Sequence, residues 1–163
     1  MAVLAALKVG SPPVVLRRAV AADLPELVAL IAADQLGVTR DGIRTDSDLE
    51  AYQRAFRDID ADPAHLLVVA QAGEDIVGTF QLSFLPGLAR RGALRAQIEA
   101  VRVGASTRSR GLGAAMMTWA IAESRRRGCG LVQLTTDKAR PDAHRFYERL
   151  GFTASHEGMK LRL

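Results

Sequence analysis

The spacing of apolar and polar positions divides the chain into alternating strands and helices. Alternation or short apolar runs predict strands over residues 14–18, 65–71, 75–85, 93–103 and 130–136. Apolar residues three and four apart predict helices over residues 24–31, 45–59, 112–127 and 141–150, the first of them capped by Asp23. Residues 152–163 alternate again and predict one or two closing strands. This order of elements predicts an α/β (α+β) protein.

One strand-to-helix connection carries the chemistry that a phosphate-binding loop needs. The strand that ends at Val103 is followed by a loop rich in Gly, Ser, Thr and Arg, which opens directly onto the helix from Leu112. The first N–H groups of a helix have no partner within it, and the helix dipole makes this end positive. Gly111 and Gly113 remove side chains that would keep a ligand from the backbone. The loop predicts a ligand with a diphosphate, and the alternative is an arginine-rich helix cap.

Spacing excludes two widespread phosphate-binding loops. The nucleotide-hydrolase loop needs a lysine directly after its last glycine, and no lysine follows Gly111 or Gly113. The dinucleotide-binding loop needs a small third residue where this chain has Met116.

Three sequence blocks resemble those of one enzyme family. Arg108-x-x-Gly111-x-Gly113 resembles the [RQ]-x-x-G-x-[GA] signature of the GNAT superfamily of N-acetyltransferases. Residues 98–103 resemble the strand that precedes this loop in the family, and residues 143–152 resemble its A-x-x-[FL]-Y-x-[KR]-x-G-F block. The chain is thus identified as a single-domain bacterial member over residues 14–163, with residues 1–13 as an N-terminal extension that is either floppy or packed.

The resemblance implies a fold, a co-substrate and a set of residues that bind it. The fold is a mixed central sheet that is splayed between its fourth and fifth strands and flanked by about four helices. The co-substrate is acetyl-CoA, and no metal is implied. Many relatives carry Asn seven residues before the family's tyrosine, where this chain has Arg140. The residues expected to bind acetyl-CoA are Val101, Arg102, Val103, Arg108, Ser109, Arg110, Gly111, Leu112, Gly113, Ala114 and Arg140.

The reaction implied is direct attack of a primary amine on acetyl-CoA in a ternary complex, with Glu99 as the expected general base. In a regular strand Glu99 shares a face with Val101 and Val103, on the side of the cofactor. It would act through one or more waters, and the alternative is a surface glutamate paired with Arg102 or Arg95. Gln97, two residues back on the same face, stands where some protein-modifying relatives carry their glutamate.

Tyr147 is the expected general acid. Phe146 and Leu150 are four residues apart and should face the core, which turns Tyr147 toward the splay. Its phenol could donate a proton to the departing CoA sulfur. The alternatives are a tyrosine that anchors the cofactor and one that only packs.

Composition narrows the partners and the compartment. The net charge is +4, but the basic residues are scattered and almost all are arginines, which is typical of a GC-rich bacterial genome. Neither a nucleic-acid surface nor a membrane-spanning or signal segment is expected, which predicts a cytoplasmic protein. The single cysteine, Cys129, is expected to be structural, and the histidines show no metal-ligand spacing. A homodimer is possible.

The sequence leaves the acceptor open between a small molecule and a peptide amine. Around the expected acceptor pocket, acidic residues face a basic group, and the acidic residues could attract a cationic amine or form a solvated helix face. The acidic residues are Asp34, Asp46, Asp48, Glu50 and Asp58, and the basic ones are Arg90, Arg91 and Arg95. The rival class is a non-catalytic acetyl-CoA-binding sensor or regulatory protein, against which the presence of both Glu99 and Tyr147 argues.

Overall fold

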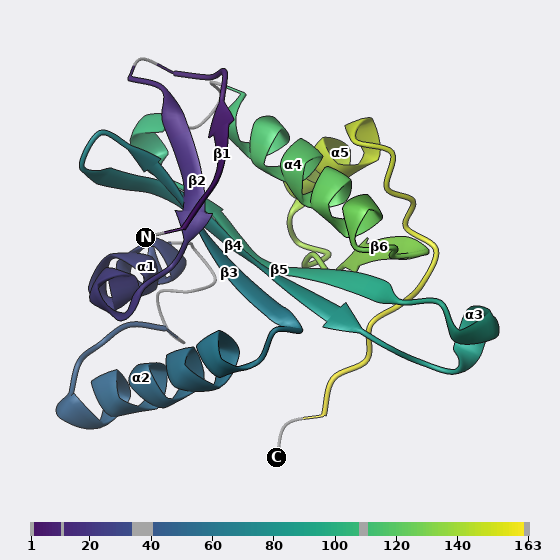
Figure 1. Ribbon diagram of the computed structural model, residues 1–163, viewed down its shortest axis with the longest axis horizontal. Coiled ribbons are helices and arrows are strands. Elements are labelled where there is room, and N and C mark those ends of the chain that lie inside the picture. Colours follow the sequence, from purple (N-terminus) through teal and green to yellow (C-terminus); the bar gives the residue numbers. More distant parts are fainter. Residues whose placement is uncertain (1, 11, 34–40, 108–110, 162–163) are drawn as a thin grey trace.

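A six-stranded sheet forms the centre of the molecule, with its strands side by side in sequence order (Figure 1). The computed structural model describes residues 2–10, 12–33, 41–107 and 111–161. Each pair of neighbouring strands from the first to the fifth is antiparallel, and the sixth strand runs parallel to the fifth. The strands are β1 (Val3–Leu7), β2 (Val14–Arg18), β3 (His65–Ala72), β4 (Asp75–Leu85), β5 (Arg95–Val103) and β6 (Leu131–Leu134).

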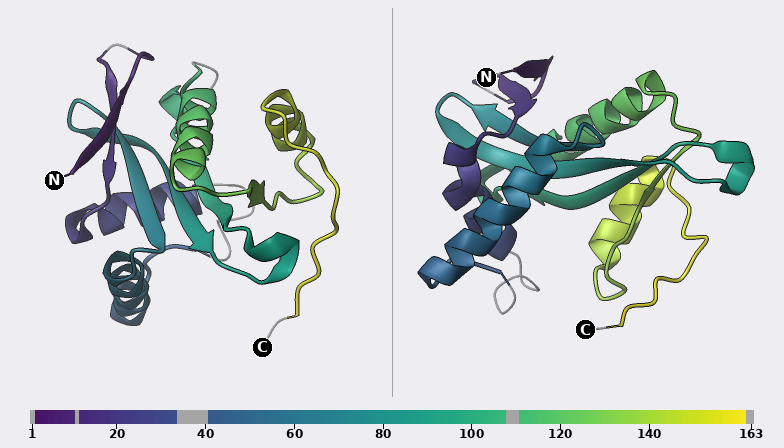
Figure 2. Two further views of the ribbon diagram at one scale, coloured as in Figure 1. Left: turned by 45° about the vertical axis from the view of Figure 1, so that its right-hand side comes forward. Right: turned by 60° about the horizontal axis from the view of Figure 1, so that its bottom comes forward.

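Helices cover both faces of this mixed sheet (Figures 1 and 2). One face carries α1 (Leu24–Ala32) and α2 (Asp46–Ala61), and the other carries α4 (Leu112–Arg126) and α5 (Pro141–Arg149). All four predicted helices are confirmed, with small shifts at their ends. The remaining helical turns are short: η1 (Ala21–Asp23), η2 (Ala105–Thr107) and α3 (Ala89–Gly92), the last of them within a predicted loop.

Two apolar clusters hold the helices to the sheet. The larger one lies under α4, where Met116 and Met117 are fully buried against strand residues such as Phe80 and Ile98. The smaller one joins Leu27 of α1 and Phe56 of α2 to Val69 of β3, among other residues. The predicted core role of the methionine pair is therefore confirmed, and α4 is fixed against the strands that form the site.

One chain end contains a strand that was not predicted, and the other lacks the predicted closing strands. Val3–Leu7 forms β1 and pairs with β2, although its short apolar run shows no alternation that would mark a strand. The closing strands expected over residues 152–163 are wrong for residues 152–161, and residues 162–163 lie outside the described part. Met159 and Leu161 are 96% and 87% exposed, so the alternating pattern finds no surface on which to bury its apolar side chains.

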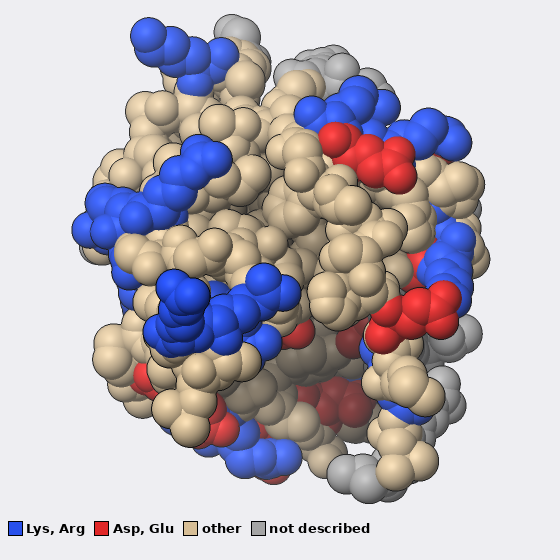
Figure 3. Space-filling model, turned by 90° about the vertical axis from the view of Figure 1, so that its right-hand side faces the viewer, with Lys and Arg blue, Asp and Glu red and all other residues tan. Residues whose placement is uncertain are grey.

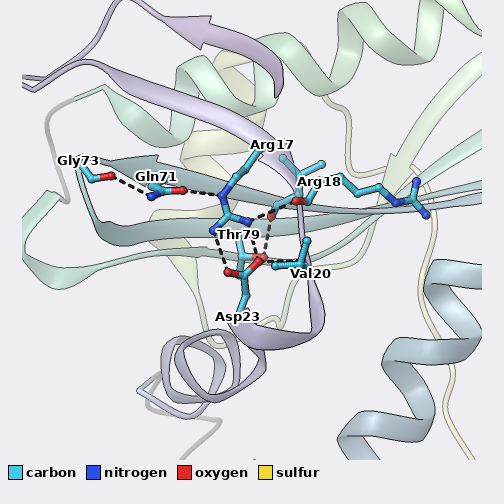
Figure 4. Close-up of polar contacts among 8 residues, drawn as sticks. Arg17, Arg18, Val20, Asp23, Gln71, Gly73 and Thr79 are labelled. Carbon is cyan, nitrogen blue, oxygen red and sulfur yellow. Dashed lines mark hydrogen bonds and ion pairs between the residues drawn. The ribbon is translucent and has the colours of Figure 1, made fainter. Parts of the chain in front are cut away.

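Asp23 also differs from its predicted role as a helix cap, because its side chain makes no cap hydrogen bond to α1. Its carboxylate instead accepts hydrogen bonds from both terminal nitrogens of Arg17, at 2.6 and 2.8 Å, and from the backbone N–H of Val20 at 2.8 Å (Figure 4). Arg17 also donates its Nε hydrogen to Gln71. This buried network ties β2 to β3 and to the start of α1.

The predicted opening of the sheet is confirmed. The ladder between β5 and β6 runs from the pair Arg95–Leu131 to the pair Ile98–Leu134 and ends there, whereas β5 continues to Val103. Because β1 adds a strand at the edge, the opening lies between the fifth and sixth strands of the sheet. It exposes one edge of β5 beside the start of α4.

Candidate active site

A β-bulge shapes β5 where the sheet opens. Gln81 of β4 lies opposite Glu99, but the next pair toward the end of β5 joins Thr79 to Arg102. Phe80 therefore faces two residues, Ala100 and Val101, in place of one. Ala100 takes a φ of +51°, a left-handed conformation that is strained for any residue with a side chain.

The bulge overturns one prediction about Glu99. A bulge shifts the alternation by one residue, so Glu99 shares its face with Arg102. Val101 and Val103 pack instead against the cluster under α4. Glu99 is exposed on the α2 side of the sheet, with Gln97 on the same face as predicted. The prediction that Glu99 shares a face with the two valines is wrong because it assumed that β5 is a regular strand. The extra residue of the bulge moves every later side chain to the other face.

The start of α4 presents backbone N–H groups beside the open end of β5. Gly111 caps the helix in a left-handed conformation, with φ +79°, and the first helical hydrogen bond runs from Ala115 to the carbonyl of Gly111 at 3.0 Å. The N–H groups of Leu112, Gly113 and Ala114 therefore have no acceptor within the helix. Arg108, Ser109 and Arg110, which were predicted to complete this loop, lie outside the described residues.

The two loop glycines differ in their surroundings. A Cβ on Gly111 would meet no atom within 4 Å, so this position is open. A Cβ on Gly113 would lie 3.5 Å from Phe146 of α5 and 3.7 Å from Val103 of β5. These are ordinary van der Waals distances, so a Cβ at Gly113 would fit between α4, the strand and α5.

Tyr147 lies in an aromatic group on α5. Its ring centre is 5.1 Å from that of Phe146 and 5.8 Å from that of Phe152, both in edge-on contact. Phe146 and Leu150 pack against the core cluster as predicted, and Tyr147 packs there too. Among the described residues, the Tyr147 hydroxyl forms no hydrogen bond.

Burial raises the pKa of the Tyr147 phenol, and the positive charges of Arg102 and Arg140 partly oppose this effect. The phenol is therefore protonated at neutral pH. Arg140 forms the N-cap of α5, and Arg102 donates from Nη1 to the Val101 carbonyl at 2.8 Å. The structure thus brings Arg102 and Arg140, from elements far apart in sequence, toward the same phenol.

A row of polar side chains on the α2 side of the sheet was missed by the sequence analysis. Ser83 lies opposite Gln97 in the β4–β5 ladder, and Gln97 lies opposite Gln133 of β6. The ring nitrogen Nδ1 of His65 is 2.8 Å from the Ser83 hydroxyl, and Gln133 donates to Gln97 at 2.7 Å. Polar residues at alternating positions of otherwise apolar strands are the signal that could have revealed this row.

Four of the acidic residues expected around the acceptor pocket lie on α2: Asp46, Asp48, Glu50 and Asp58. Asp48 closes a capping box with Thr45 at the start of α2, and Glu50 lies 3.8 Å from Arg54 on the same helix. Asp34 lies outside the described residues. In the described part of the chain, no group of His, Cys, Asp and Glu residues could hold a metal ion, and no helix is long and apolar enough to span a membrane.

A mixed sheet that opens between β5 and β6, with the start of a helix beside the opening, defines the acetyltransferase fold that the sequence resemblance implied. The chain belongs to the Acetyltransferase (GNAT) family, which matches residues 31–152.

Two relatives of known activity are N-acetyltransferases. The chain is similar to the aminoalkylphosphonate N-acetyltransferase of Salmonella typhimurium, with 30% identity over 142 residues that make up 86% of each protein. It is also similar to the glucosamine 6-phosphate N-acetyltransferase of Trypanosoma brucei brucei, with 39% identity over 89 residues, 54% of this chain and 58% of that one.

Solved structures match nearly the whole chain. A crystal structure described as a transcriptional regulator from Bacillus halodurans is 46% identical, with a TM-score of 0.87 over 92% of this chain and 99% of that one. A putative acetyltransferase from Agrobacterium tumefaciens is 31% identical, with a TM-score of 0.78 over 91% of this chain and 99% of that one.

Proposed function

We propose that this protein transfers an acetyl group from acetyl-CoA to the primary amine of a small molecule or peptide. One observation carries the proposal: the open edge of β5 lies beside the N-terminus of α4. The family and the two N-acetyltransferases among its relatives support the same reaction.

The residues at the opening fit acetyl-CoA. The amide groups of a pantetheine arm can pair with the backbone of β5 beyond Ile98, where the ladder with β6 ends, as an added strand would. A diphosphate fits the N–H groups of Leu112, Gly113 and Ala114, where the helix dipole favours negative charge. Arg140 adds a positive charge near Tyr147 for the same anionic ligand.

The amine must lose a proton before it can attack, and Glu99 acts as the general base that takes it. A primary amine titrates near pH 10.4, so at pH 7.4 the penalty for the neutral form is about 4 kcal/mol. Glu99 stands at the bulge, exposed to solvent on the α2 side of the opening. A carboxylate there accepts the proton through water, and the neutral amine that results then attacks the thioester carbonyl.

Tyr147 supplies the proton that the sulfur of the leaving CoA needs. Its pKa is raised by burial, so the phenol keeps its proton at neutral pH. Arg102 and Arg140 stabilise the phenolate that remains after transfer, and solvent restores the proton. Because a thiol is a fair leaving group, this acid contributes toward the low end of the usual range of about 10²–10⁴-fold.

The acetyl group passes directly to the amine in a ternary complex. The one cysteine, Cys129, lies in the turn between α4 and β6, and burial raises the pKa of its thiol despite the nearby charge of Arg127. A protonated thiol is a weak nucleophile, which argues against an acetyl-enzyme at this residue.

The relatives favour a small acceptor over a peptide. The names of the two N-acetyltransferases give their acceptors as an aminoalkylphosphonate and glucosamine 6-phosphate, both of which are small amines. The polar row from His65 to Gln133 supplies hydrogen-bonding groups on the same face as Glu99.

The test is release of the CoA thiol from acetyl-CoA in the presence of a panel of amines, amino acids and peptides. The proposal predicts release that depends on the amine, with initial-velocity lines that intersect as both substrates are varied. Tight acetyl-CoA binding without transfer to any amine would instead identify a sensor, and parallel lines would indicate an acetyl-enzyme.

A further inference from the structure

Three arginines gather where β4 turns into β5. Arg90 and Arg91 form the middle of α3, and Arg95 begins β5. The guanidinium of Arg95 reaches back over Gly87, whose Cβ position lies 3.9 Å from its Nη2 atom. Within the described residues, none of the three side chains forms an ion pair or hydrogen bond, whereas Arg126 and Arg127 share Glu123.

The backbone that carries this group is strained. Arg90 and Arg91 have φ values of +56° and +59°, so both lie in the left-handed region, followed by Gly92 at +76°. Glycine and asparagine adopt this conformation more easily than arginine does. Two consecutive arginines at such positions place two cations in one tight turn at a conformational cost, which points to a role for their charge.

The arginines stand at one end of the face that carries the proposed general base. Arg95, Gln97 and Glu99 alternate along β5 before the bulge, so their side chains share the α2 side of the sheet. A strand rises by about 3.4 Å per residue, so Arg95 and Glu99 begin about 14 Å apart. Seen from the side of α3, a group of basic side chains lies at one side of a hollow that has acidic side chains within it (Figure 3).

The surface between the two ends is polar. Gln97 accepts a hydrogen bond from Gln133, and Ser83, opposite Gln97, lies in contact with His65. This face therefore offers a carboxylate at one end, hydrogen-bonding groups in the middle and guanidinium groups at the other end. It matches a small polar molecule whose amine and anionic group are separated by a short chain or a sugar ring.

We propose that Arg90, Arg91 and Arg95 bind the anionic end of the amine acceptor, a phosphonate or phosphate group. This inference rests on the proposed function, since it places the acceptor amine at Glu99. Guanidinium groups bind phosphorus oxyanions through paired N–H donors, and several of them match a dianion better than a single negative charge. The arginines therefore set which amines the enzyme accepts.

Paired acceptors that differ in the anionic group test the assignment. The probes are aminoethylphosphonate with ethanolamine, and glucosamine 6-phosphate with glucosamine. The variants are Arg95→Gln and the double variant Arg90→Gln with Arg91→Gln, and Arg125→Gln, an exposed arginine on α4, is the control. For at least one pair, we expect the charge-removing variants to raise KM for the phosphorylated amine about tenfold or more, with a smaller change in kcat. The unphosphorylated partner and the control should not change.

Calorimetric titration with the same phosphorylated amines separates this inference from the proposed function. Binding to the wild type that weakens in the Arg95→Gln and double variants supports the arginine site even if no amine is acetylated. A wild type that acetylates both members of each pair equally well overturns the inference and leaves the proposed function standing. The inference is also overturned if the charge-removing variants lose activity to the same extent with both members of a pair. It is overturned as well if the wild type binds neither phosphorylated amine.

Discussion

Glu99 of β5 lies directly opposite Gln81 of β4, at the last regular pair before the bulge at Ala100. Beyond the bulge, Arg102 appears on the same face as Glu99, and the valines turn toward α4. The open end of β5 therefore presents a carboxylate and a guanidinium on one side and an apolar surface on the other. A regular strand could not place these groups in this way.

The strain at the bulge gives a stability prediction. In the left-handed region a Cβ costs about 1–2 kcal/mol, and a glycine loses about 0.5–1 kcal/mol in chain entropy. Ala100→Gly should therefore leave the free energy of unfolding unchanged or raise it by up to about 1.5 kcal/mol, as measured in urea. Ala122→Gly, at an exposed position inside α4, should lower it by about 1 kcal/mol. Equal destabilisation by both changes would contradict the strained bulge.

Two neighbouring arginines provide a matched test of the buried network. Arg17 binds Asp23 where both side chains are 10% exposed or less, whereas Arg18 binds Asp60, which is 51% exposed. Asp23→Asn should lower the free energy of unfolding by about 3–5 kcal/mol, because it leaves a buried charge without its counter-ion. Asp60→Asn should cost less than about 1 kcal/mol. Similar costs for the two variants would show that burial does not set the strength of the Arg17–Asp23 pair.

The same network predicts a dependence on pH. Burial alone raises the pKa of Asp23, but the hydrogen bonds from Arg17 and Val20 outweigh it and hold the pKa below the usual value. The stabilisation is therefore complete above the pKa of an unfolded aspartate, near 3.9, and is lost as the pH falls through the lowered value. Urea unfolding should show a weaker acid dependence in Asp23→Asn than in the wild type.

Substitution of the proposed base should act on turnover. Glu99→Gln keeps the shape of the side chain, so the affinity for acetyl-CoA should change little while kcat falls. The loss should be greater at about pH 7 than at about pH 9.5, where more of the amine is already neutral. Glu74→Gln, in the exposed turn between β3 and β4, is the control and should have no effect. An equal loss at both pH values would assign Glu99 to substrate positioning.

The role of Tyr147 depends on one hydroxyl group. Tyr147→Phe should lower turnover about tenfold to a few hundredfold while the acetyl-CoA dissociation constant shifts little. Because burial raises its pKa, the phenol stays protonated up to mildly alkaline pH, so the loss should be the same at about pH 7 and about pH 9. Tyr52→Phe removes a hydroxyl that accepts the Gly42 N–H, and it should affect stability more than turnover. Unchanged turnover in Tyr147→Phe would show that Tyr147 serves only to pack against its neighbours.

The elements near the site could be predicted because their signals are local. The run from Gly111 to Met116 combines a helix start with apolar spacing, and the apolar strands on either side of it show a clear period. The opening of the sheet followed from the resemblance of three short blocks. These signals placed Val103, Gly111 and Tyr147 in the correct elements.

The remaining features depend on contacts that no local pattern carries. The bulge at Ala100 inserts one residue into a strand whose composition stays regular, so the alternation assigned Glu99 to the wrong face. Asp23 stands where a helix cap is common, but its partner Arg17 is held by Gln71, 54 positions further along the chain. In the sequence, residues 89–92 are typical of a basic loop, and only the structure shows the left-handed backbone of Arg90 and Arg91.

The most direct test of the account compares two glycines at opposite ends of α4. Gly111 and Gly128 have φ values of +79° and +77°, and a Cβ on either would meet no atom within 4 Å. Gly111→Leu and Gly128→Leu therefore carry the same backbone penalty, but only the first places bulk at the proposed diphosphate site. Calorimetric titration with acetyl-CoA should show binding to the wild type and to Gly128→Leu, and at least tenfold weaker binding to Gly111→Leu. Wild-type affinity in a folded Gly111→Leu variant, or no binding to the wild type, would contradict the proposed acetyl-CoA site.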